Sequence, residues 1–201
     1  MDTYFTISGR SEGLYKEKGS KFISLAFPVA AEEEVKPIIS DLKKEYYDAR
    51  HHCYAWRLGS DGGRTRTMDD GEPSSTAGKP ILGQIVSNDL TNILIVVIRY
   101  FGGTKLGVSG LIRAYRDAAA DAIANAEIVE RTVDAYYTVS FSYTEMNSVM
   151  KVIKDLSPNV HSQNFDNLCE MTISVRRDNE EITISRFRDI EGVTATFIEY
   201  R

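Results

Sequence analysis

An apolar segment near the middle of the chain constrains the fold more than any other feature. Residues Asn92–Tyr100 form a nearly uninterrupted run that is rich in β-branched side chains. Such a run is typical of a central strand that is covered on both faces. Its apolar part, Ile93–Ile98, is far shorter than the roughly 20 residues that a helix needs to cross a bilayer. We therefore predict a domain built around this strand, with no membrane span.

The segments on either side of this strand show the patterns of further strands and helices. The predicted strands are Lys21–Val29, His51–Leu58 and Arg64–Met68, and the predicted helices are Ala31–Tyr47, Pro80–Val86 and Leu111–Ala126. We place Pro37 in the first turn of its helix and Pro80 at the first helical position, where a missing N–H is tolerated. Ser109 is predicted to cap the alanine-rich helix.

The second half of the chain repeats a strand and helix pattern after a predicted connector at residues 127–134. The predicted elements are strand Ala135–Tyr143, helix Glu145–Leu156, strands Val160–Phe165 and Cys169–Val175, helix Glu180–Arg188 and strand Val193–Tyr200. Asp166-Asn167 is the expected turn between the two middle strands. This βαββαβ order is the ferredoxin-like one. With 201 residues, we predict an α+β fold with two domains, residues 1–130 and 131–201.

Composition and charge narrow the class of protein. The chain is 42% hydrophobic and 26% charged, with a net charge of −5 and two cysteines, which fits a globular protein with two reduced thiols. The N-terminus has neither a basic nor an apolar signal region, so we expect a cytoplasmic protein. Residues 43–120 hold 11 Lys and Arg against 8 Asp and Glu. A locally basic segment can hold phosphate even in an acidic protein.

An acidic loop follows the third predicted strand. Asp69, Asp70 and Glu72 can coordinate a hard cation, and one of them can serve as a general base. The alternative is that Asp70 only builds a turn while Glu72 pairs with Lys79 or Arg99. No cofactor motif is evident, no metal site is assigned, and Mg²⁺ is the one candidate ion.

A glycine-rich loop follows the central strand and opens the alanine-rich helix. Such a loop can bind an anion, because it combines free backbone N–H groups, the positive end of the helix and a cation. Its basic residues alternate with aromatic ones, and this combination can hold a phosphodiester backbone. The alternatives are that the glycines only permit a tight turn, and that Arg99 and Arg113 only balance the acidic loop. The candidate ligand-binding residues are Lys79, Arg99, Tyr100, Gly102, Gly103, Lys105, Ser109 and Arg113.

Several familiar motifs are excluded. Pro73 and Pro80 stand where a phosphate loop of the Walker type has Gly and Ser or Thr. The Gly102-Gly103 loop fails the dinucleotide-binding spacing. Successive side chains of a strand point to opposite faces, so His51 and Cys53 lie on one face and His52 lies on the other. Two ligands on one face are too few for a structural zinc site, which needs about four. The chain carries no motif that reads DNA sequence.

Two long segments carry a family resemblance. Asp69–Leu82 and Arg99–Tyr115 closely resemble the signatures of the IMPACT family, in particular its bacterial YigZ-type members, and Lys21-Phe22-Ile23 and His52–Ala55 add to the match. The sequence departs from the family pattern at Ser75 and Ser109, where glycine is expected, and at Met68, where serine is usual.

The resemblance implies an N-terminal domain like the second domain of the fifth small-subunit ribosomal protein. This domain would be joined to a ferredoxin-like domain similar to those in elongation factor G. Eukaryotic relatives are linked to translational control through the activator of an initiation-factor kinase, by means of an additional domain that this sequence lacks. Bacterial members have no firmly assigned reaction, so the resemblance supplies no catalytic residue.

Three functional hypotheses follow, and all depend on the acidic loop and the glycine-rich loop meeting at one solvent-open edge of the N-terminal sheet. The first is a cytoplasmic protein that binds RNA or a component of the translation machinery. The second is an enzyme that acts on a phosphorylated or anionic small molecule, with metal held by the acidic loop. The third is a protein-interaction scaffold, which is expected if the loops are internally paired with no pocket between them. The sequence leaves enzymatic activity and oligomeric state open.

Overall fold

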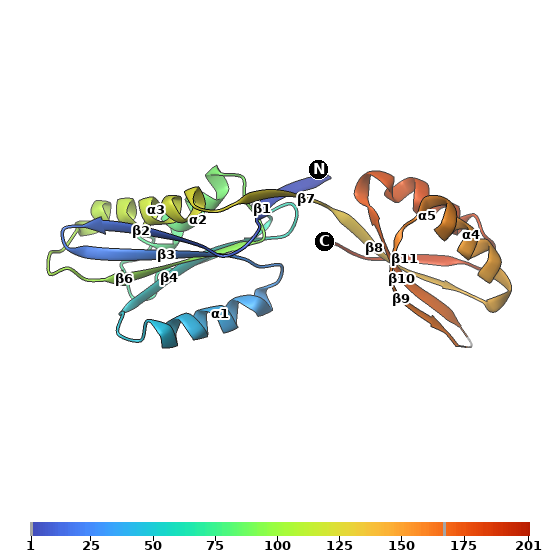
Figure 1. Cartoon of the computed structure of the whole chain (residues 1–201), viewed down its shortest axis with the longest axis horizontal. Coiled ribbons are helices and arrows are strands. Elements are labelled where there is room, and N and C mark those ends of the chain that lie inside the picture. The colour runs from blue at the N-terminus through green and yellow to red at the C-terminus, as the bar shows by residue number, and fades with distance from the viewer. Residues whose placement is uncertain (1, 167) are drawn as a thin grey trace. The chain divides into compact units, whose positions relative to one another are not determined.

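The structure is a computed structural model that describes residues 2–166 and 168–201, and these form two compact units (Figure 1). The N-terminal domain comprises Tyr4–Arg131, and the C-terminal domain comprises Thr132–Arg201 together with the start of the chain up to Thr3. Asp2 is bound there by Arg176, whose Nη2 lies 2.6 Å from its Oδ2. The division after residue 131 lies one residue from the expected one, but the first residues belong to the second unit.

The N-terminal domain contains a five-stranded antiparallel sheet in the order β2-β3-β6-β4-β5. Its strands are β2 (Ser11–Glu17), β3 (Ser20–Pro28), β4 (His51–Leu58), β5 (Arg64–Met68) and β6 (Ile93–Tyr100). The helices α2 (Gly78–Ser87) and α3 (Gly107–Ala124) cover one face, and α1 (Glu32–Glu45) covers the other (Figure 1). The predicted central strand is therefore confirmed as β6.

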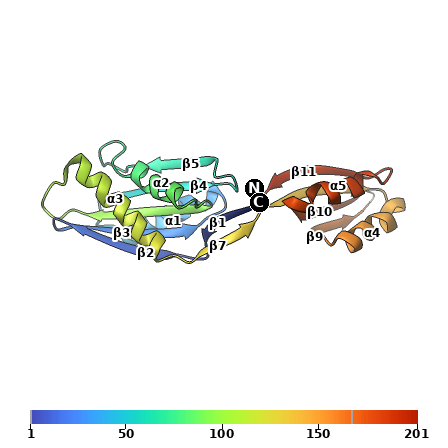
Figure 2. The ribbon, with the colours of Figure 1, turned by 90° about the horizontal axis from the view of Figure 1, so that it is seen from above.

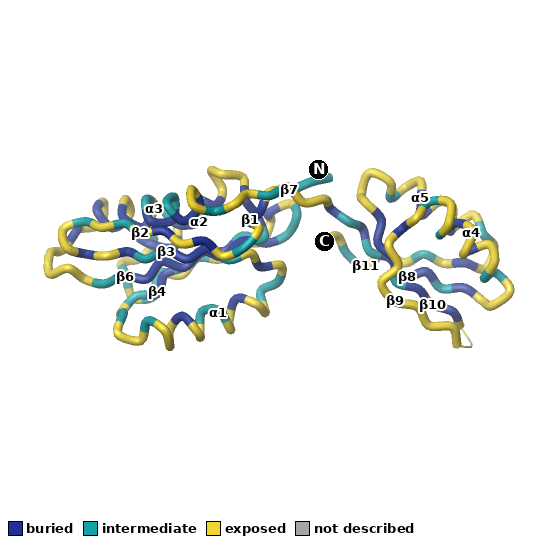
Figure 3. Tube along the Cα trace, viewed as in Figure 1, coloured by how far each residue is buried: buried dark blue, intermediate teal, exposed yellow. Residues whose placement is uncertain are grey.

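Alternation along β6 explains why its sequence is apolar throughout. Ile95 and Val97 point into the core beneath α2 and α3, whereas Leu94, Val96 and Ile98 point into the core beneath α1. Successive side chains of a strand point to opposite faces, so a strand between two layers has no face for polar residues. Figure 3 shows β6 as buried along nearly its whole length.

The positions predicted for three residues near helix starts are wrong. Pro37 is the sixth residue of α1 rather than part of its first turn; it is exposed, so water can bind the carbonyl that its missing N–H leaves free. Pro80 is the third residue of α2. Ser109 lies inside α3, whose N-cap residue is Leu106, and it does not cap this helix.

Three strands of the N-terminal half, β1 (Thr3–Ile7), β2 and β7 (Ile128–Thr132), were not predicted from the sequence. The strands β1 and β7 pair as a separate two-stranded sheet, so the predicted connector at residues 127–134 is partly a strand. The edge strand β2 packs against α3 through small side chains. Ser11 donates its hydroxyl to the Ala122 carbonyl at 2.8 Å, and a Cβ on Gly13 would lie only 2.4 Å from the Ala122 nitrogen.

The C-terminal domain has the predicted βαββαβ order. Its elements are β8 (Asp134–Phe141), α4 (Met146–Leu156), β9 (Asn159–Phe165), β10 (Cys169–Arg176), α5 (Glu180–Arg188) and β11 (Thr194–Tyr200), with short 3₁₀ turns at Tyr143–Glu145 and Arg177–Asn179. The antiparallel sheet has the order β11-β8-β10-β9. Figure 2 shows this sheet and its helices from above. The expected turn at residues 166–167 includes Asn167, which lies outside the described residues.

These two domains confirm the predicted α+β class with a ferredoxin-like second domain. None of the helices in the described part of the chain is both long and apolar enough to span a bilayer.

Candidate functional site

Several loops meet at one end of the N-terminal sheet. Because β4 is antiparallel to both β5 and β6, the last residues of β5 and β6 and the first residue of β4 lie at the same end. The first residue of β3 lies there too, since β3 is antiparallel to β6. We call this end the rim; it is drawn at the left of Figure 2. Its segments are residues 18–19, 46–50, 69–77 and 101–106.

Asp69 organises the acidic loop and the start of α2. Its Oδ1 accepts the backbone N–H groups of Ala77 at 3.1 Å and Gly78 at 2.8 Å, and its Oδ2 accepts that of Ser75 at 2.8 Å. Burial alone would raise the pKa of this carboxyl, but these three donors outweigh it, and the pKa lies below the ordinary value. Both oxygens are therefore engaged within the protein.

Asp70 is engaged within the protein as well. Its Oδ2 accepts the backbone N–H of His52 at 2.8 Å, and its Oδ1 lies 3.3 Å from Lys43 Nζ. Its carbonyl oxygen lies 2.9 Å from His51 Nδ1. The loop is thus tied to α1 and to the first residues of β4.

Glu72 joins the acidic loop to the end of β6. Its Oε1 lies 2.6 Å from Arg99 Nη1 and accepts the Tyr115 hydroxyl at 2.9 Å. The side chains of Glu72 and Arg99 are only 4% and 7% exposed. Of the two partners considered for Glu72 from sequence, the structure selects Arg99 and leaves Lys79 in solvent.

A buried thiol lies behind this pair. Cys53 Sγ lies 3.3 Å from the Tyr115 hydroxyl oxygen and 2.9 Å from the Asp69 carbonyl oxygen. Burial raises the pKa values of both Cys53 and Tyr115 far above their ordinary values. Cys53 is therefore a protonated thiol at neutral pH and is unsuited to attack a substrate.

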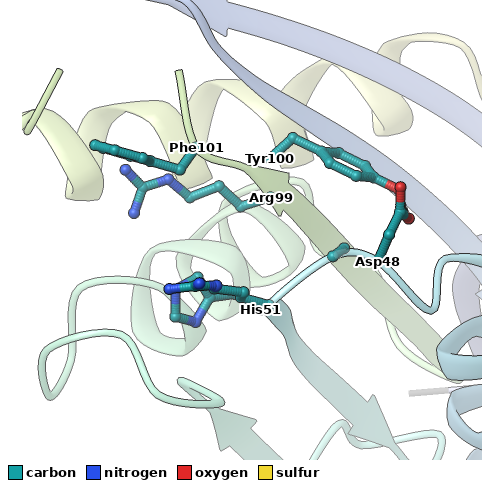
Figure 4. A pocket seen from close by; sticks show the side chains of 7 residues that line it. Asp48, His51, Arg99, Tyr100 and Phe101 are labelled. Carbon is teal, nitrogen blue, oxygen red and sulfur yellow. Dashed lines mark hydrogen bonds between the residues drawn. The ribbon is translucent and has the colours of Figure 1, made fainter. Parts of the chain in front are cut away.

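Arg99 also forms part of a hollow at the rim, which we call the Arg99 hollow (Figure 4). The hollow has a volume of about 410 Å³. It lies between residues 48–51 on one side and, on the other, the last two residues of β6 and Phe101, which follows them. The Arg99 guanidinium carbon lies 5.5 Å from the Phe22 ring centre and 5.6 Å from that of Phe101. Its charged group therefore lies within cation–π distance of two aromatic rings, which is a favourable arrangement.

Tyr100 contributes to the same hollow through Asp48. The Tyr100 hydroxyl donates to Asp48 Oδ1 at 2.7 Å. This hydrogen bond, together with partial desolvation, raises the pKa of Tyr100 to about 12, so the phenol is neutral at physiological pH.

The two adjacent glycines of the rim have different surroundings. A Cβ on Gly102 would lie 1.9 Å from the Gly19 carbonyl carbon, so only glycine fits where the two loops cross. The Gly102 N–H also donates to Ser20 Oγ at 3.1 Å. Gly103 has a φ of +89° and open space around it. Gly102 thus serves the packing of the turn, which was one of the two interpretations left open by the sequence.

The predicted cations differ in how they are paired. Arg113 is exposed but binds Glu17, with Nη2 and Oε1 3.0 Å apart. Ser109 is exposed in the first turn of α3. In the described part of the chain, Lys79 and Lys105 form no salt bridge, and the same holds for exposed Lys18, Lys21 and Arg50. These last three cations were not singled out from sequence, because Arg50 is far along the chain from Lys18 and Lys21 and only the fold brings them to one end.

The residues of the acidic loop do not form a metal cluster. Within residues 2–166 and 168–201, no group of three or more His, Cys, Asp or Glu side chains is arranged to hold a metal ion. The oxygens of Asp69, Asp70 and Glu72 instead accept hydrogen bonds from the backbone, from Lys43, from Arg99 and from Tyr115.

Fold and rim together define a two-domain α+β protein in which several loops are hydrogen-bonded to one another at one end of the N-terminal sheet and carry exposed cations. The Impact N-terminal domain matches residues 18–123, which include all the segments of the rim. The chain therefore belongs to the IMPACT family, as its sequence motifs predict.

Individual relatives agree with this assignment. The chain is 34% identical over 155 residues to IMPACT family member YvyE of Bacillus subtilis, covering 77% of this chain and 71% of that protein. It is 35% identical over 134 residues to IMPACT family member YigZ of Escherichia coli, covering 66% of each. A crystal structure of a hypothetical protein superposes with a TM-score of 0.79 at 25% identity, covering 99% of this chain and 98% of that one.

Proposed function

We propose that the protein binds single-stranded RNA of the translation machinery through the rim. One observation carries this proposal: five exposed cations at or next to the rim have no salt-bridge partner among the described residues. They are Lys18, Lys21, Arg50, Lys79 and Lys105. Unpaired Lys and Arg side chains are what a protein uses to neutralise backbone phosphates.

The carboxylates of the rim cancel these cations only in part. Asp70 and Glu72 are each paired with a cation within the protein, whereas Asp69 and Asp48 keep their negative charge while they accept hydrogen bonds. Among the described residues, five unpaired cations therefore face two carboxylates of the rim that have no cationic partner. Because local charge decides what a surface attracts, the rim can favour a polyanion although the whole chain carries a net charge of −5.

Two further features support a single-stranded ligand. Tyr47 and Phe101 are 83% and 58% exposed at the rim, and exposed aromatic rings are platforms on which unpaired bases stack. The helix α3 begins at this end of the sheet, so the positive end of its dipole adds to the attraction for phosphate. The start of α2 is already occupied by the Asp69 carboxylate.

The connection with translation is supported by the family. The chain belongs to the IMPACT family, which includes eukaryotic proteins named IMPACT, and the resemblance links such relatives with translational control. A role in translation would be carried out in the cytoplasm. The enzymatic hypothesis has less support, since Asp69 and Glu72 would have to leave buried donors before they could bind a metal or accept a substrate proton.

Fluorescence anisotropy with a labelled single-stranded RNA tests this proposal. The logarithm of the binding constant is expected to fall with the logarithm of salt concentration at a slope of roughly −0.7 per neutralised phosphate, or about −3.5 for five contacts. Lys105→Ala should make the slope less steep by about 0.7. Arg64→Ala is the matched control, because Arg64 is an exposed, unpaired cation at the opposite end of β5.

Binding that is independent of salt, or that Lys105→Ala and Arg64→Ala weaken equally, would contradict the proposal. Cosedimentation with ribosomal subunits then examines the connection with translation. The expected result is comigration that rising salt abolishes and that Lys105→Ala weakens.

A further inference from the structure

The charges that line the Arg99 hollow balance one another. The Arg99 guanidinium is neutralised by Glu72 at 2.6 Å. Asp48 and Arg50, which also line the hollow, add one charge of each sign. A phosphate placed here would lie beside a carboxylate and would gain no excess positive charge. The hollow therefore suits a neutral ligand, whereas the four unpaired lysines of the rim that do not line it suit phosphates. They are Lys18, Lys21, Lys79 and Lys105.

The hollow nevertheless has unused hydrogen-bonding groups. A guanidinium carries five N–H donors, and in the described structure Arg99 makes one hydrogen bond, from Nη1 to Glu72. Its Nε is buried without any partner. Asp48 offers the complementary group, since only its Oδ1 accepts the Tyr100 hydroxyl. Figure 4 shows Arg99 and Asp48 on opposite sides of the hollow, so donors and acceptors are offered from two directions.

An exposed aromatic ring completes the lining. Phe101 is 58% exposed and lies beside the Arg99 guanidinium (Figure 4). Arg99 also contacts the fully buried ring of Phe22 and is paired with Glu72, so the guanidinium is held in place before any ligand arrives. Balanced charge, hydrogen-bond donors and acceptors in the same lining, and an open aromatic surface together match a planar group with a polar edge.

We propose that the Arg99 hollow receives one unpaired nucleobase of the bound RNA, with the base stacked on Phe101 and its edge hydrogen-bonded to Arg99 and Asp48. Nucleobases are neutral, planar and carry both donors and acceptors on their edges. This inference rests on the proposed function, because the cations of the rim hold the phosphates on either side of that base.

The test uses strands with equal numbers of phosphates. One strand of about 12 nucleotides carries a single 2-aminopurine among abasic sugars, and the other is abasic throughout. Binding to the full-length protein should quench the 2-aminopurine fluorescence through stacking. The one-base strand should bind about 5- to 150-fold more tightly than the abasic strand, the range expected for one stacked base.

Phe101→Ala is expected to abolish both the quenching and this difference in affinity, while leaving the binding of the abasic strand unchanged. Tyr47→Ala is the matched control, because Tyr47 is an even more exposed aromatic residue of the rim that does not line the hollow. It should preserve the quenching. Should Phe101→Ala fail to fold, Phe101→Leu takes its place, because leucine keeps an apolar side chain but removes the ring on which the base stacks.

The outcomes separate this inference from the function on which it rests. Equal affinity for the two strands, with no quenching and a steep salt dependence, overturns the base site and leaves RNA binding in place. Loss of quenching in Tyr47→Ala but not in Phe101→Ala also overturns the base site. Failure of both strands to bind overturns the proposed function itself.

Discussion

Ser75 occupies a backbone conformation that glycine adopts more easily, so Ser75→Gly is expected to stabilise the N-terminal domain. Its φ is 65°, in the left-handed region where Cβ crowds the carbonyl oxygen at a cost of roughly 1–2 kcal/mol. Its backbone N–H donates to Asp69 at 2.8 Å, and glycine retains this donor. Its hydroxyl has no hydrogen-bond partner among the described residues, so little is lost with the side chain.

The size of the effect follows from two opposing contributions. Removing Cβ relieves roughly 1–2 kcal/mol of strain, and the greater freedom of glycine in the unfolded chain costs about 0.5–1 kcal/mol. The net gain in the free energy of unfolding is about 0.5–1 kcal/mol. The same substitution at Ser109 should have the opposite effect on stability. Ser109 has ordinary helical geometry inside α3, so Ser109→Gly is expected to lower the free energy of unfolding by about 0.5 kcal/mol.

The assay is urea or thermal unfolding followed by tryptophan fluorescence. The chain has a single tryptophan, Trp56, which is 5% exposed in β4, so the signal reports on the N-terminal domain. Ser75→Gly should raise its midpoint temperature by roughly 2–6 °C. Ser75→Ala is the control, because it removes the hydroxyl but keeps the strained Cβ. Equal shifts for the two Ser75 variants, or a fall in the midpoint for Ser75→Gly, would refute the reasoning.

Three further predictions concern the packing and charge of the rim, all measured by the same unfolding assay. Glu72→Gln should lower the free energy of unfolding by about 3–5 kcal/mol, because it leaves the buried Arg99 charge without a carboxylate; a loss below about 1 kcal/mol would argue against a buried ion pair. The Asp69 carboxylate, with its pKa below the ordinary 3.8, should stabilise the fold fully above that value and progressively less as pH falls through the folded pKa. Asp69→Asn should make stability depend less on pH in the acid range, and an unchanged pH dependence in this variant would contradict the role given to Asp69. Gly102→Ala should lower the free energy of unfolding by more than about 2 kcal/mol, because its Cβ would meet the Gly19 backbone at 1.9 Å. If this variant is as stable as the unmodified protein, the two loops can separate to make room for the methyl group.

Much of the fold could be predicted because strong patterns coincide with packing. Both faces of β6 are buried in cores, so its apolar run is unambiguous. The strand β2 was missed for the opposite reason. Its inward positions include Ser11 and Gly13, whose small size lets α3 approach closely, and such residues do not produce an apolar alternation. The presence of a helix was easier to predict than its first residue. Ser109 was predicted to cap α3 but lies inside it.

The candidate site could be predicted only in part from the sequence. The motifs located the acidic and glycine-rich loops, but the partner of Glu72 was decided by which strand end lies beside it, and this depends on sheet order. Lys18 and Arg50 were missed because no local signal distinguishes an unpaired surface cation from a paired one. Asp48 was missed because its role depends on Tyr100, which is 52 residues away in sequence.

The path of the chain has a practical consequence for dissecting this protein. The polypeptide passes between the two compact units twice, after Thr3 and after Arg131, and Asp2 is bound by Arg176 and accepts the backbone N–H of Val133 at 2.7 Å. A fragment beginning at Thr132 would therefore lose native contacts of its own unit. Conversely, a peptide appended to or trimmed from the amino end acts on the ferredoxin-like unit. After a single protease cut near residue 131, the noncovalent contacts of Asp2 with Arg176 and Val133 still hold the two pieces together.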